Sequence, residues 1–351
     1  MRLKKNRSRR VCLAAALSMA FMLSGCGGAG ERIQGAMQMI GGLDYQGALE
    51  QLDTAEKDGE NIRLVNRARG IAYMGLTDYE QAAFWFEEAL GESSGLVQDV
   101  DYDLNFYLAA AYTKNGRYSD AEDIYDTILD LRPGEEEAYF LRGNVRLVQG
   151  NYAGAKEDFD KVISMDAKNY DRLIEIHEVL DYFGYGEVGR EYLQAALSAG
   201  EKTMDKYASG RIYYYLGEYQ KAYLDLEEAR ESGGVESYLY LGKSYEATGD
   251  FNYAANVYNS YLEKYDGNAE IYNQLGLCEM ERGEYRKALE TFQAGMQLQN
   301  VTMMQTLSFN EIVAYEYLGD YRQASILMEN YLRNYPDDTQ ARREYEFLST
   351  R

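Results

Sequence analysis

The sequence predicts an all-α protein built from stacked pairs of helices, and three observations lead to this prediction. Apolar residues recur every three or four positions, the spacing that places them on one face of a helix. Only two prolines occur in 351 residues, and no sustained alternation of apolar and polar residues indicates a strand. A pattern of about 34 residues also repeats along the chain, which is typical of one helical unit used many times.

The first 25 residues are predicted to be a signal peptide for secretion rather than part of the fold. Residues 1–10 carry six basic side chains and no acid, and the thirteen residues 11–23 are almost entirely apolar. That length suits a signal-peptide core and is too short to span a bilayer. The segment ends in Leu23-Ser24-Gly25-Cys26, which resembles the lipobox of bacterial lipoproteins. The resemblance implies diacylglycerol on Cys26, cleavage before it and a short tether over residues 26–30. An ordinary secretory signal or an uncleaved anchor is the alternative.

Charge and composition exclude several kinds of partner and site. The formal net charge of −22 argues against nucleic acid, and without the six basic charges of residues 1–10 it becomes −28. His177 is the only histidine, so no metal site is expected. Cys12 would leave with the signal and Cys26 would take lipid, so Cys278 has no disulfide partner. Nothing in the sequence indicates a cofactor.

The repeat is clearest around a glycine that is followed two residues later by an aromatic residue and five residues later by alanine. Gly116, Tyr118, Ala121 and Tyr125 give the first complete example. The same spacing recurs from Gly150, Gly217, Gly249, Gly283 and Gly319, and upstream at Tyr79 and Tyr45, with Thr77 in one glycine slot.

This pattern, Trp/Tyr-x2-Leu-Gly-x2-Tyr, eight residues, then Ala-x3-Phe-x2-Ala-x4-Pro, resembles the tetratricopeptide repeat. The resemblance implies a right-handed α-solenoid of about nine helix-turn-helix repeats over residues 29–336. Pro133 and Pro336 both fall at position 32, where the second helix should end. Residues 337–351 then predict a C-terminal capping helix. The predicted repeat starts are residues 29, 63, 102, 136, 170, 203, 235, 269 and 305.

Each conserved position of the family pattern has a physical reason. Position 8 is small because the two helices of a repeat cross there, and position 15 is glycine because the chain turns, commonly through φ > 0. Large apolar residues at positions 11, 17 and 24 fill the core. The fifth repeat departs from the pattern, with His177 at position 8 and Gly189 at position 20. We therefore expect looser packing or a bend in that repeat.

The candidate catalytic features all have structural explanations. Residues 184–189 read G-x-G-x-x-G, but a helix rather than a strand is expected before them, so nucleotide binding is not predicted. His177 and Cys278 fall at packing positions, and the acidic pairs lie on outward faces. No nucleophile, base and oxyanion donor come together, so the sequence predicts no enzyme.

The remaining candidate is a surface. Positions 2, 5, 9, 12 and 13 share one stripe of each first helix, and the resemblance implies a concave groove that takes peptide segments. The family's carboxylate clamp of Lys and Asn is absent as a set. The alternative for any single residue is packing against neighbouring helices. The stripe contains Phe106, Phe140, Asn144, Ile174, Glu178, Tyr182, Tyr207, Arg211, Tyr214, Tyr215, Leu239 and Lys243.

The sequence thus predicts a membrane-anchored, extracytoplasmic scaffold that binds a protein or peptide segment, for example in an envelope or secretion complex. Gly27 stands where inner-membrane retention would call for aspartate, so a host with two membranes would send the protein to its outer membrane. The runner-up is a glycan- or solute-binding surface lipoprotein, because the many tyrosines could stack on sugars. An enzyme with a site between repeats is a third possibility.

Overall fold

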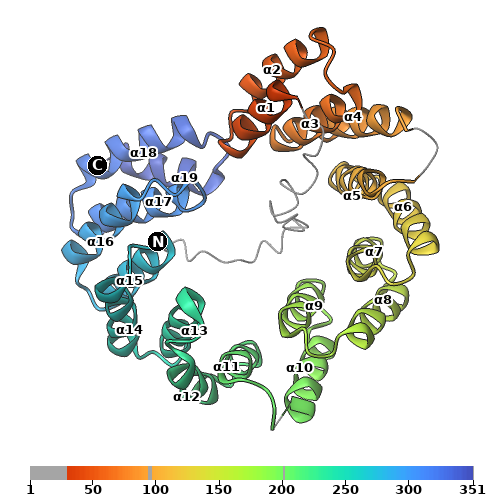
Figure 1. The fold of residues 1–351 in the computed structure, drawn as a ribbon. Helices are drawn as coiled ribbons and strands as arrows, with labels where there is room; N and C mark the ends of the chain where they lie inside the picture. Colours follow the sequence, from red (N-terminus) through yellow and green to blue (C-terminus); the bar gives the residue numbers. More distant parts are fainter. Residues whose placement is uncertain (1–29, 94–96, 201, 351) are drawn as a thin grey trace. The chain divides into compact units, whose positions relative to one another are not determined.

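The computed structural model describes residues 30–93, 97–200 and 202–350, and every regular element in these ranges is a helix. Nineteen helices, α1 to α19, follow one another within the described residues, and the first eighteen form nine helix-turn-helix pairs (Figure 1). The predicted all-α fold class and the repeated helix pair are therefore confirmed. The predicted signal peptide and Cys26 lie outside the described residues.

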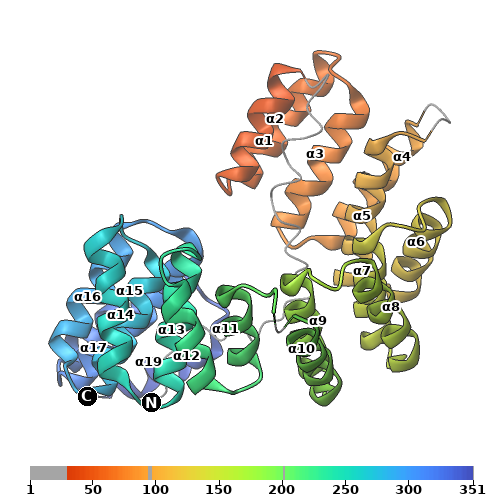
Figure 2. The same cartoon turned by 60° about the horizontal axis from the view of Figure 1, so that its bottom comes forward.

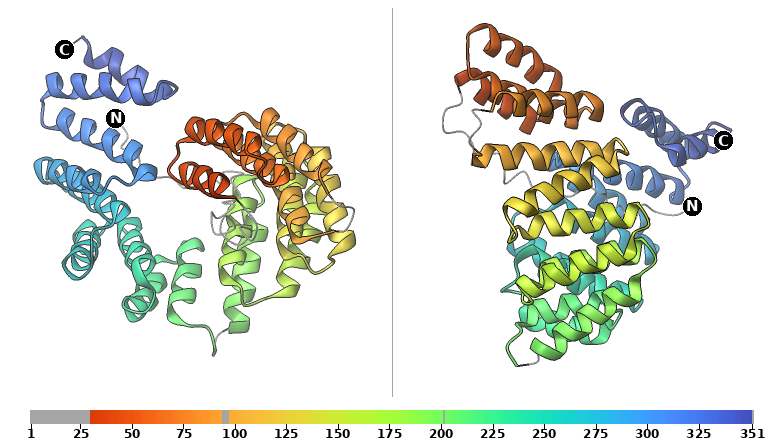
Figure 3. Two further views of the ribbon diagram at one scale, coloured as in Figure 1. Left: turned by 45° about the horizontal axis from the view of Figure 1, so that its top comes forward. Right: turned by 90° about the vertical axis from the view of Figure 1, so that its right-hand side faces the viewer.

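The chain divides into two compact units between Gly189 and Arg190, inside α10 (Gly186–Gly200). The N-terminal unit is described from residue 30 to residue 189. From α1 to α8 each helix packs on the next, and α3 also packs on α1 and α5 (Figure 3). Its helices are α1 (Glu31–Gly41), α2 (Tyr45–Lys57), α3 (Ile62–Gly75), α4 (Tyr79–Gly91), α5 (Asp99–Lys114), α6 (Tyr118–Leu131), α7 (Glu136–Val148), α8 (Tyr152–Met165) and α9 (Tyr170–Tyr182).

The C-terminal unit is described over residues 190–200 and 202–350. From α11 to α19 each helix packs on the next, and first helices of successive pairs also touch, as α11 touches α13 and α15 touches α17 (Figure 2). Its helices after α10 are α11 (Lys206–Tyr215), α12 (Tyr219–Ala229), α13 (Gly234–Ala247), α14 (Phe251–Lys264), α15 (Ala269–Glu281), α16 (Tyr285–Gln297), α17 (Val301–Tyr317), α18 (Tyr321–Asn334) and α19 (Thr339–Leu348).

The turn inside each pair has the backbone conformation expected at position 15. Gly116 has φ +76 and Gly249 has φ +82, in the left-handed region that glycine enters without strain. Where the pattern lacks glycine, the conformation persists: Thr77 has φ 60 and Leu43 has φ 65. Packing of the two helices therefore imposes the turn even on residues that disfavour it.

A close contact between position 8 and position 24 holds the two helices of a pair together. An added Cβ at position 8 would lie 2.3–2.7 Å from an atom of the position-24 side chain, so only hydrogen fits there. All five position-24 side chains are fully buried. The pairs are Gly70 with Phe86, Gly143 with Phe159, Gly210 with Leu226, Gly242 with Tyr258 and Gly276 with Phe292.

The fifth repeat keeps close packing by a different combination of side chains. His177 at position 8 is buried, and a Cβ on Gly189 would lie 2.6 Å from its Nδ1 atom and 2.8 Å from its Cα atom. A larger residue at position 8 is thus matched by the smallest residue at position 20. Around His177 the expected looser packing is not found, and the alternative of a bend stays a prediction.

The last helix covers the end of the C-terminal unit. Ala341 and Leu348 of α19 are buried in a core that also contains Met328 of α18, while Arg342 and Arg343 are exposed. Glu316 of α17 is partly buried nearby. Burial, and next the negative charge of Glu344 on α19, raise the pKa of Glu316 to about 8. The unfolded chain would bind fewer protons at this carboxyl at neutral pH than the folded chain does.

We expect Gly70→Ala to destabilise the N-terminal unit by roughly 1–2 kcal/mol, because overpacking against Phe86 outweighs the gain in helix propensity. Thermal and urea unfolding followed by circular dichroism and by the fluorescence of Trp85, the chain's one tryptophan, would measure it. Gly41→Ala is the matched control, since a Cβ at Gly41 meets nothing within 4 Å. Equal stabilities of the two variants would contradict the packing explanation.

A second prediction concerns pH. Because the folded pKa of Glu316 is raised, its effect on stability is absent below about pH 4.5 and grows unfavourable as pH rises towards 8. Glu316→Gln should therefore raise the melting temperature more at pH 8 than at pH 5. We expect a difference of roughly 2–4 °C, which corresponds to about 1 kcal/mol once solvent screening of this partly buried carboxyl is taken into account. Glu346→Gln, at an exposed position of α19, is the control and should leave this pH dependence unchanged. A parallel shift at both pH values would exclude the titration of Glu316 as the cause.

Candidate partner-binding surface

In the N-terminal unit, internal packing accounts for most of the predicted stripe. Phe140 and Ile174 are only 6% and 2% exposed. The ring of Phe140 lies beside the ring of Phe159 at 6.1 Å and under the guanidinium of Arg172 at 4.2 Å. Phe106 is partly buried, with its ring 6.2 Å from that of Tyr125. These residues therefore pack against neighbouring side chains, which was the alternative to a role in binding. A binding role for them stays a prediction.

Asn144, the polar member of this group, is 7% exposed, and its Oδ1 atom has no hydrogen-bond partner among the described residues. Arginines close by are held by acids. Arg172 pairs with Glu136, Glu137 and Glu175, and Arg142 bonds Asp158 at 2.6 Å. Arg172 and Arg142 are thus engaged in ion pairs within the N-terminal unit.

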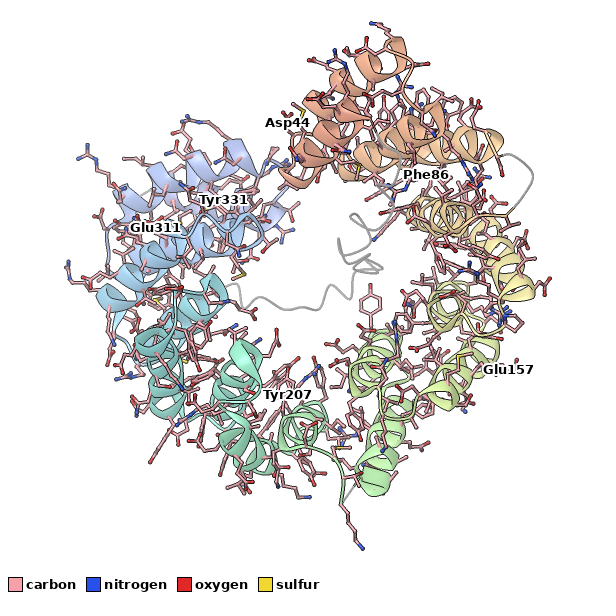
Figure 4. The ribbon with its side chains drawn as sticks, viewed as in Figure 1. Asp44, Phe86, Glu157, Tyr207, Glu311 and Tyr331 are labelled. Atoms are coloured by element: carbon pink, nitrogen blue, oxygen red, sulfur yellow. The ribbon has the colours of Figure 1, made fainter. Side chains whose placement is uncertain are left out.

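In the C-terminal unit the structure brings several predicted residues together on α11 and α13. Tyr207, Arg211 and Tyr214 lie at helical spacing on one side of α11, whose start is capped by Asp205 accepting from the backbone N–H of Ala208 at 2.8 Å. Leu239 of α13 is 3% exposed and belongs to the core beneath. Figure 4 marks Tyr207 among the side chains between these helices. Leu239 therefore supports this surface from below.

We name this surface the tyrosine–cation patch. Its members are all partly exposed side chains: Tyr207, Arg211, Tyr214, Tyr215, Tyr240 and Lys243.

Tyr240 is the centre of the patch. Its ring lies 5.3 Å from that of Tyr214 at an angle of 70°, and its hydroxyl is 3.0 Å from that of Tyr215. The guanidinium of Arg211 and the ammonium of Lys243 lie 5.4 Å and 5.8 Å from the centre of the same ring. Aromatic faces attract cations at such distances. Tyr240 thus joins four side chains from two helices.

Burial and acidic neighbours both affect the electrostatics of the patch. Burial raises the pKa of Tyr214 to about 12, so its hydroxyl keeps its proton at neutral pH. The Nζ atom of Lys243 lies 2.9 Å from Oε1 of Glu270 on α15. Burial is the largest single influence and would lower the pKa of Lys243. The charge of Glu270, the hydrogen bond to it and the nearby Tyr214 and Tyr240 together outweigh burial, and the pKa of Lys243 is raised. Lys243 is therefore protonated and fixed in place.

Sequence reasoning missed Tyr240 and Glu270. Tyr240 stands at position 6 of its repeat, outside the stripe of positions that faces outward in a generic repeat. Its spacing of three residues from Lys243 was the available signal, since such residues share a helix face. Glu270 lies one repeat further on, in the first turn of α15, so its contact with Lys243 of α13 appears only in the tertiary structure.

Other features weighed from the sequence can be located among the described residues. Among them no three His, Cys, Asp or Glu side chains converge as metal ligands. Cys278 is buried. The G-x-G-x-x-G segment follows the helix α9, and Gly184 within it adopts φ +86 at the turn. No helix in the described part of the chain is both long and apolar enough to cross a bilayer.

The fold and the patch define a class: a helical-repeat protein with an aromatic surface on its first helices. Profiles described as tetratricopeptide repeat match residues 73–144, 136–169, 207–269 and 239–297, more than half of the chain together. The chain belongs to the tetratricopeptide repeat family, as the sequence resemblance indicated.

Similar proteins carry the same kind of repeat. RNA polymerase II-associated protein 3 of Xenopus laevis is 24% identical over 161 residues, 46% of this chain and 22% of its own length. The BBSome complex member BBS4 of Bos taurus is 25% identical over 157 residues, 44% of this chain and 30% of its own length. The matched segments thus span about a fifth to a third of these relatives.

Two solved structures are also similar. The yeast Tom70 structure aligns with a TM-score of 0.50 and 14% identity, covering 91% of this chain and 80% of its own. A tetratricopeptide repeat protein from Parabacteroides merdae aligns with a TM-score of 0.42 and 19% identity, covering 71% of this chain and 97% of its own. At this level of sequence identity, the similarity to Tom70 supports a shared fold and nothing more.

A third prediction follows from the burial of Tyr214. Because its folded pKa is raised to about 12, stability should fall as pH rises from 10 towards 12, where the unfolded phenol ionises and the folded one does not. Tyr214→Phe should remove roughly 1 kcal/mol of this loss at pH 11, measured by urea unfolding. Tyr253→Phe, at an exposed tyrosine of the same unit, serves as the control. An equal effect of both variants would show that Tyr214 is not the group responsible.

Proposed function

We propose that this tetratricopeptide repeat protein is a non-catalytic scaffold that binds a segment of a partner protein at the tyrosine–cation patch. One observation carries the proposal: four tyrosines and two cations from α11 and α13 meet in a partly exposed cluster centred on Tyr240. Tyrosine and arginine are enriched among the residues that contribute most to protein interfaces.

The rigidity of the patch supports a binding role. Ring contacts and the Tyr215–Tyr240 hydroxyl bond fix the side chains before a partner arrives. A fixed surface loses less conformational entropy on binding than a mobile one. The family itself is associated with protein partners, and the similar BBS4 is described as a complex member.

We further propose that the scaffold acts outside the cytoplasm, held to a membrane by lipid on Cys26. The basic residues 1–10, the apolar residues 11–23 and the Leu-Ser-Gly-Cys ending support this proposal. Such an anchor would bring the patch near a membrane surface, where a bound partner could enter an envelope or secretion complex. In a host with two membranes, the outer membrane is the expected location.

A second candidate function is glycan binding, and a tyrosine stack outside the patch favours it. Tyr223 and Tyr245 stack at 4.7 Å, and Tyr245 and Tyr253 at 5.5 Å, with Tyr253 59% exposed. An exposed ring face of this kind could stack on a sugar ring. Glycan-array binding that Tyr253→Ala abolishes would favour this candidate over the scaffold.

The scaffold is tested by affinity capture from the native envelope with the full-length protein as bait. Tyr207→Asp and Arg211→Glu should each reduce the recovered partner by at least about tenfold, because each places a negative charge in a closely packed contact. Arg322→Glu, at an exposed arginine of α18, makes the same charge change as Arg211→Glu and should have no effect. Undiminished recovery with both patch variants would remove the patch from the proposal.

A further inference from the structure

A stack of three tyrosine rings, from three successive helices of the C-terminal unit, ends at an exposed ring. The rings of Tyr223 on α12 and Tyr245 on α13 lie 4.7 Å apart at 12°. The rings of Tyr245 and Tyr253 on α14 lie 5.5 Å apart at 24°, and Tyr253 is 59% exposed. The outer ring of the stack is therefore held on one face, and much of the rest of it is accessible to solvent.

Polar side chains flank the exposed ring along α14. Asp250 stands three residues before Tyr253, and Asn256 stands three residues after it. Residues at this spacing are neighbours on a helix surface. Asn252 and Asn256 are exposed, and Asp250 is partly exposed. At 1.5 Å per residue the stripe from Asp250 to Asn256 is about 9 Å long. A carboxylate, an aromatic ring and an amide thus follow one another along one stripe.

Asp250 brings a negative charge close to the stack. Its backbone N–H donates to the carbonyl oxygen of Tyr245 at 2.9 Å, which fixes the backbone of Asp250 against the end of α13. Burial is the largest cause that raises the pKa of Tyr245, and the charges of Glu227 and Asp250 add to it. Tyr245 is therefore protonated at neutral pH, and the negative charge beside the stack comes from carboxylates.

The cations on and next to α12 are paired with other acids. Lys221 forms an ion pair with Glu218, and Arg230 forms one with Glu227 at 3.0 Å. Asp250 makes no capping hydrogen bond to α14, and it takes part in no ion pair among the residues that the structure describes. Asp250 therefore gives the exposed end of the stack a net negative charge.

This combination favours a sugar ring that carries an amine. The face of a tyrosine ring offers apolar surface to the C–H groups of a sugar and attracts cations. A protonated amine forms a charge-assisted hydrogen bond with a carboxylate. A basic peptide would also satisfy Asp250, but the exposed side chains next to Tyr253 on α14 are amides. Amides donate to and accept from hydroxyl groups, so they match a sugar better than apolar peptide side chains.

We infer, on the basis of the second candidate function, that the tyrosine stack binds an oligosaccharide with a free amine on its sugar ring. Tyr253 packs on the ring, Asp250 pairs with the ammonium group, and Asn256 bonds a sugar hydroxyl. An acidic polysaccharide would meet Asp250 with the same sign of charge, and an N-acetylated sugar would bring it no charge. The site uses none of the side chains of the tyrosine–cation patch.

The test compares oligomers of glucosamine, N-acetylglucosamine and glucose of equal length and linkage, which differ only in the group on one ring carbon. Dissociation constants for the full-length protein are measured by titration calorimetry below neutral pH, where the amine is protonated. We expect the glucosamine oligomer to bind at least about tenfold more tightly than the other two, as expected for a charge-assisted hydrogen bond. The preference should shrink at high salt, because the contact is partly exposed.

Variants assign the preference to particular side chains. Asp250→Asn should lower the affinity for the glucosamine oligomer to that for the glucose oligomer, because the charge is lost while the shape is kept. Tyr253→Ala should weaken the binding of every oligomer at least about tenfold, because the ring platform is lost. Asp266→Asn makes the same change at an exposed aspartate beyond α14 and is the matched control. Unfolding curves establish that each variant is folded, and Asp250→Asn provides a second route if Tyr253→Ala does not fold.

The outcomes separate this inference from the second candidate function. Equal affinities for the three oligomers, all lost in Tyr253→Ala, would overturn the amine preference and keep glycan binding. No binding of any oligomer would overturn both. An amine preference that persists in Asp250→Asn would overturn the inference. A lysine-rich peptide that displaces the glucosamine oligomer and binds more tightly would also overturn it, in favour of a protein partner.

Discussion

The structure depends on the contact between a glycine at position 8 and a large side chain at position 24. In five repeats the space at position 8 holds no Cβ atom, and the facing ring or leucine is completely buried. Because the helices cross so closely, the turn between them must be short, which explains the left-handed conformation at position 15. In these five repeats the contact fixes the two helices of a pair closely against each other.

The same constraint explains where a binding surface can form. Once position 8 is fixed against the second helix, the adjacent residues of the first helix point either to the neighbouring pair or to solvent. In the N-terminal unit the space is filled by Phe140 under Arg172 and by buried Ile174. In the C-terminal unit the corresponding Leu239 is buried, whereas the four tyrosines of α11 and α13 that surround it stay partly exposed. These tyrosines form most of the tyrosine–cation patch.

Much of the candidate site could be predicted one residue at a time but not as a set. Tyr207, Arg211, Tyr214 and Lys243 were found because helical spacing assigns them to one stripe. The same rule also selected Phe140, Ile174 and Leu239, which are buried. Periodicity within one helix states which face a residue occupies, but it does not state how closely the next pair approaches that face. Tyr240 and Glu270 were missed for the same reason, since their contacts cross from one pair to the next.

By itself the sequence determined the fold class, the repeated helix pair, and the glycines that close approach and turning require. It could do so because these features are local and recur at a fixed spacing. The tertiary structure decided which stripe residues are buried and which side chains surround Arg211. It also decided that the small Gly189 compensates for the larger His177 in the fifth repeat. These depend on the distances between helices that pack on one another, which the periodicity within a single helix does not specify, and side-chain volume at one position limits what its neighbour can be.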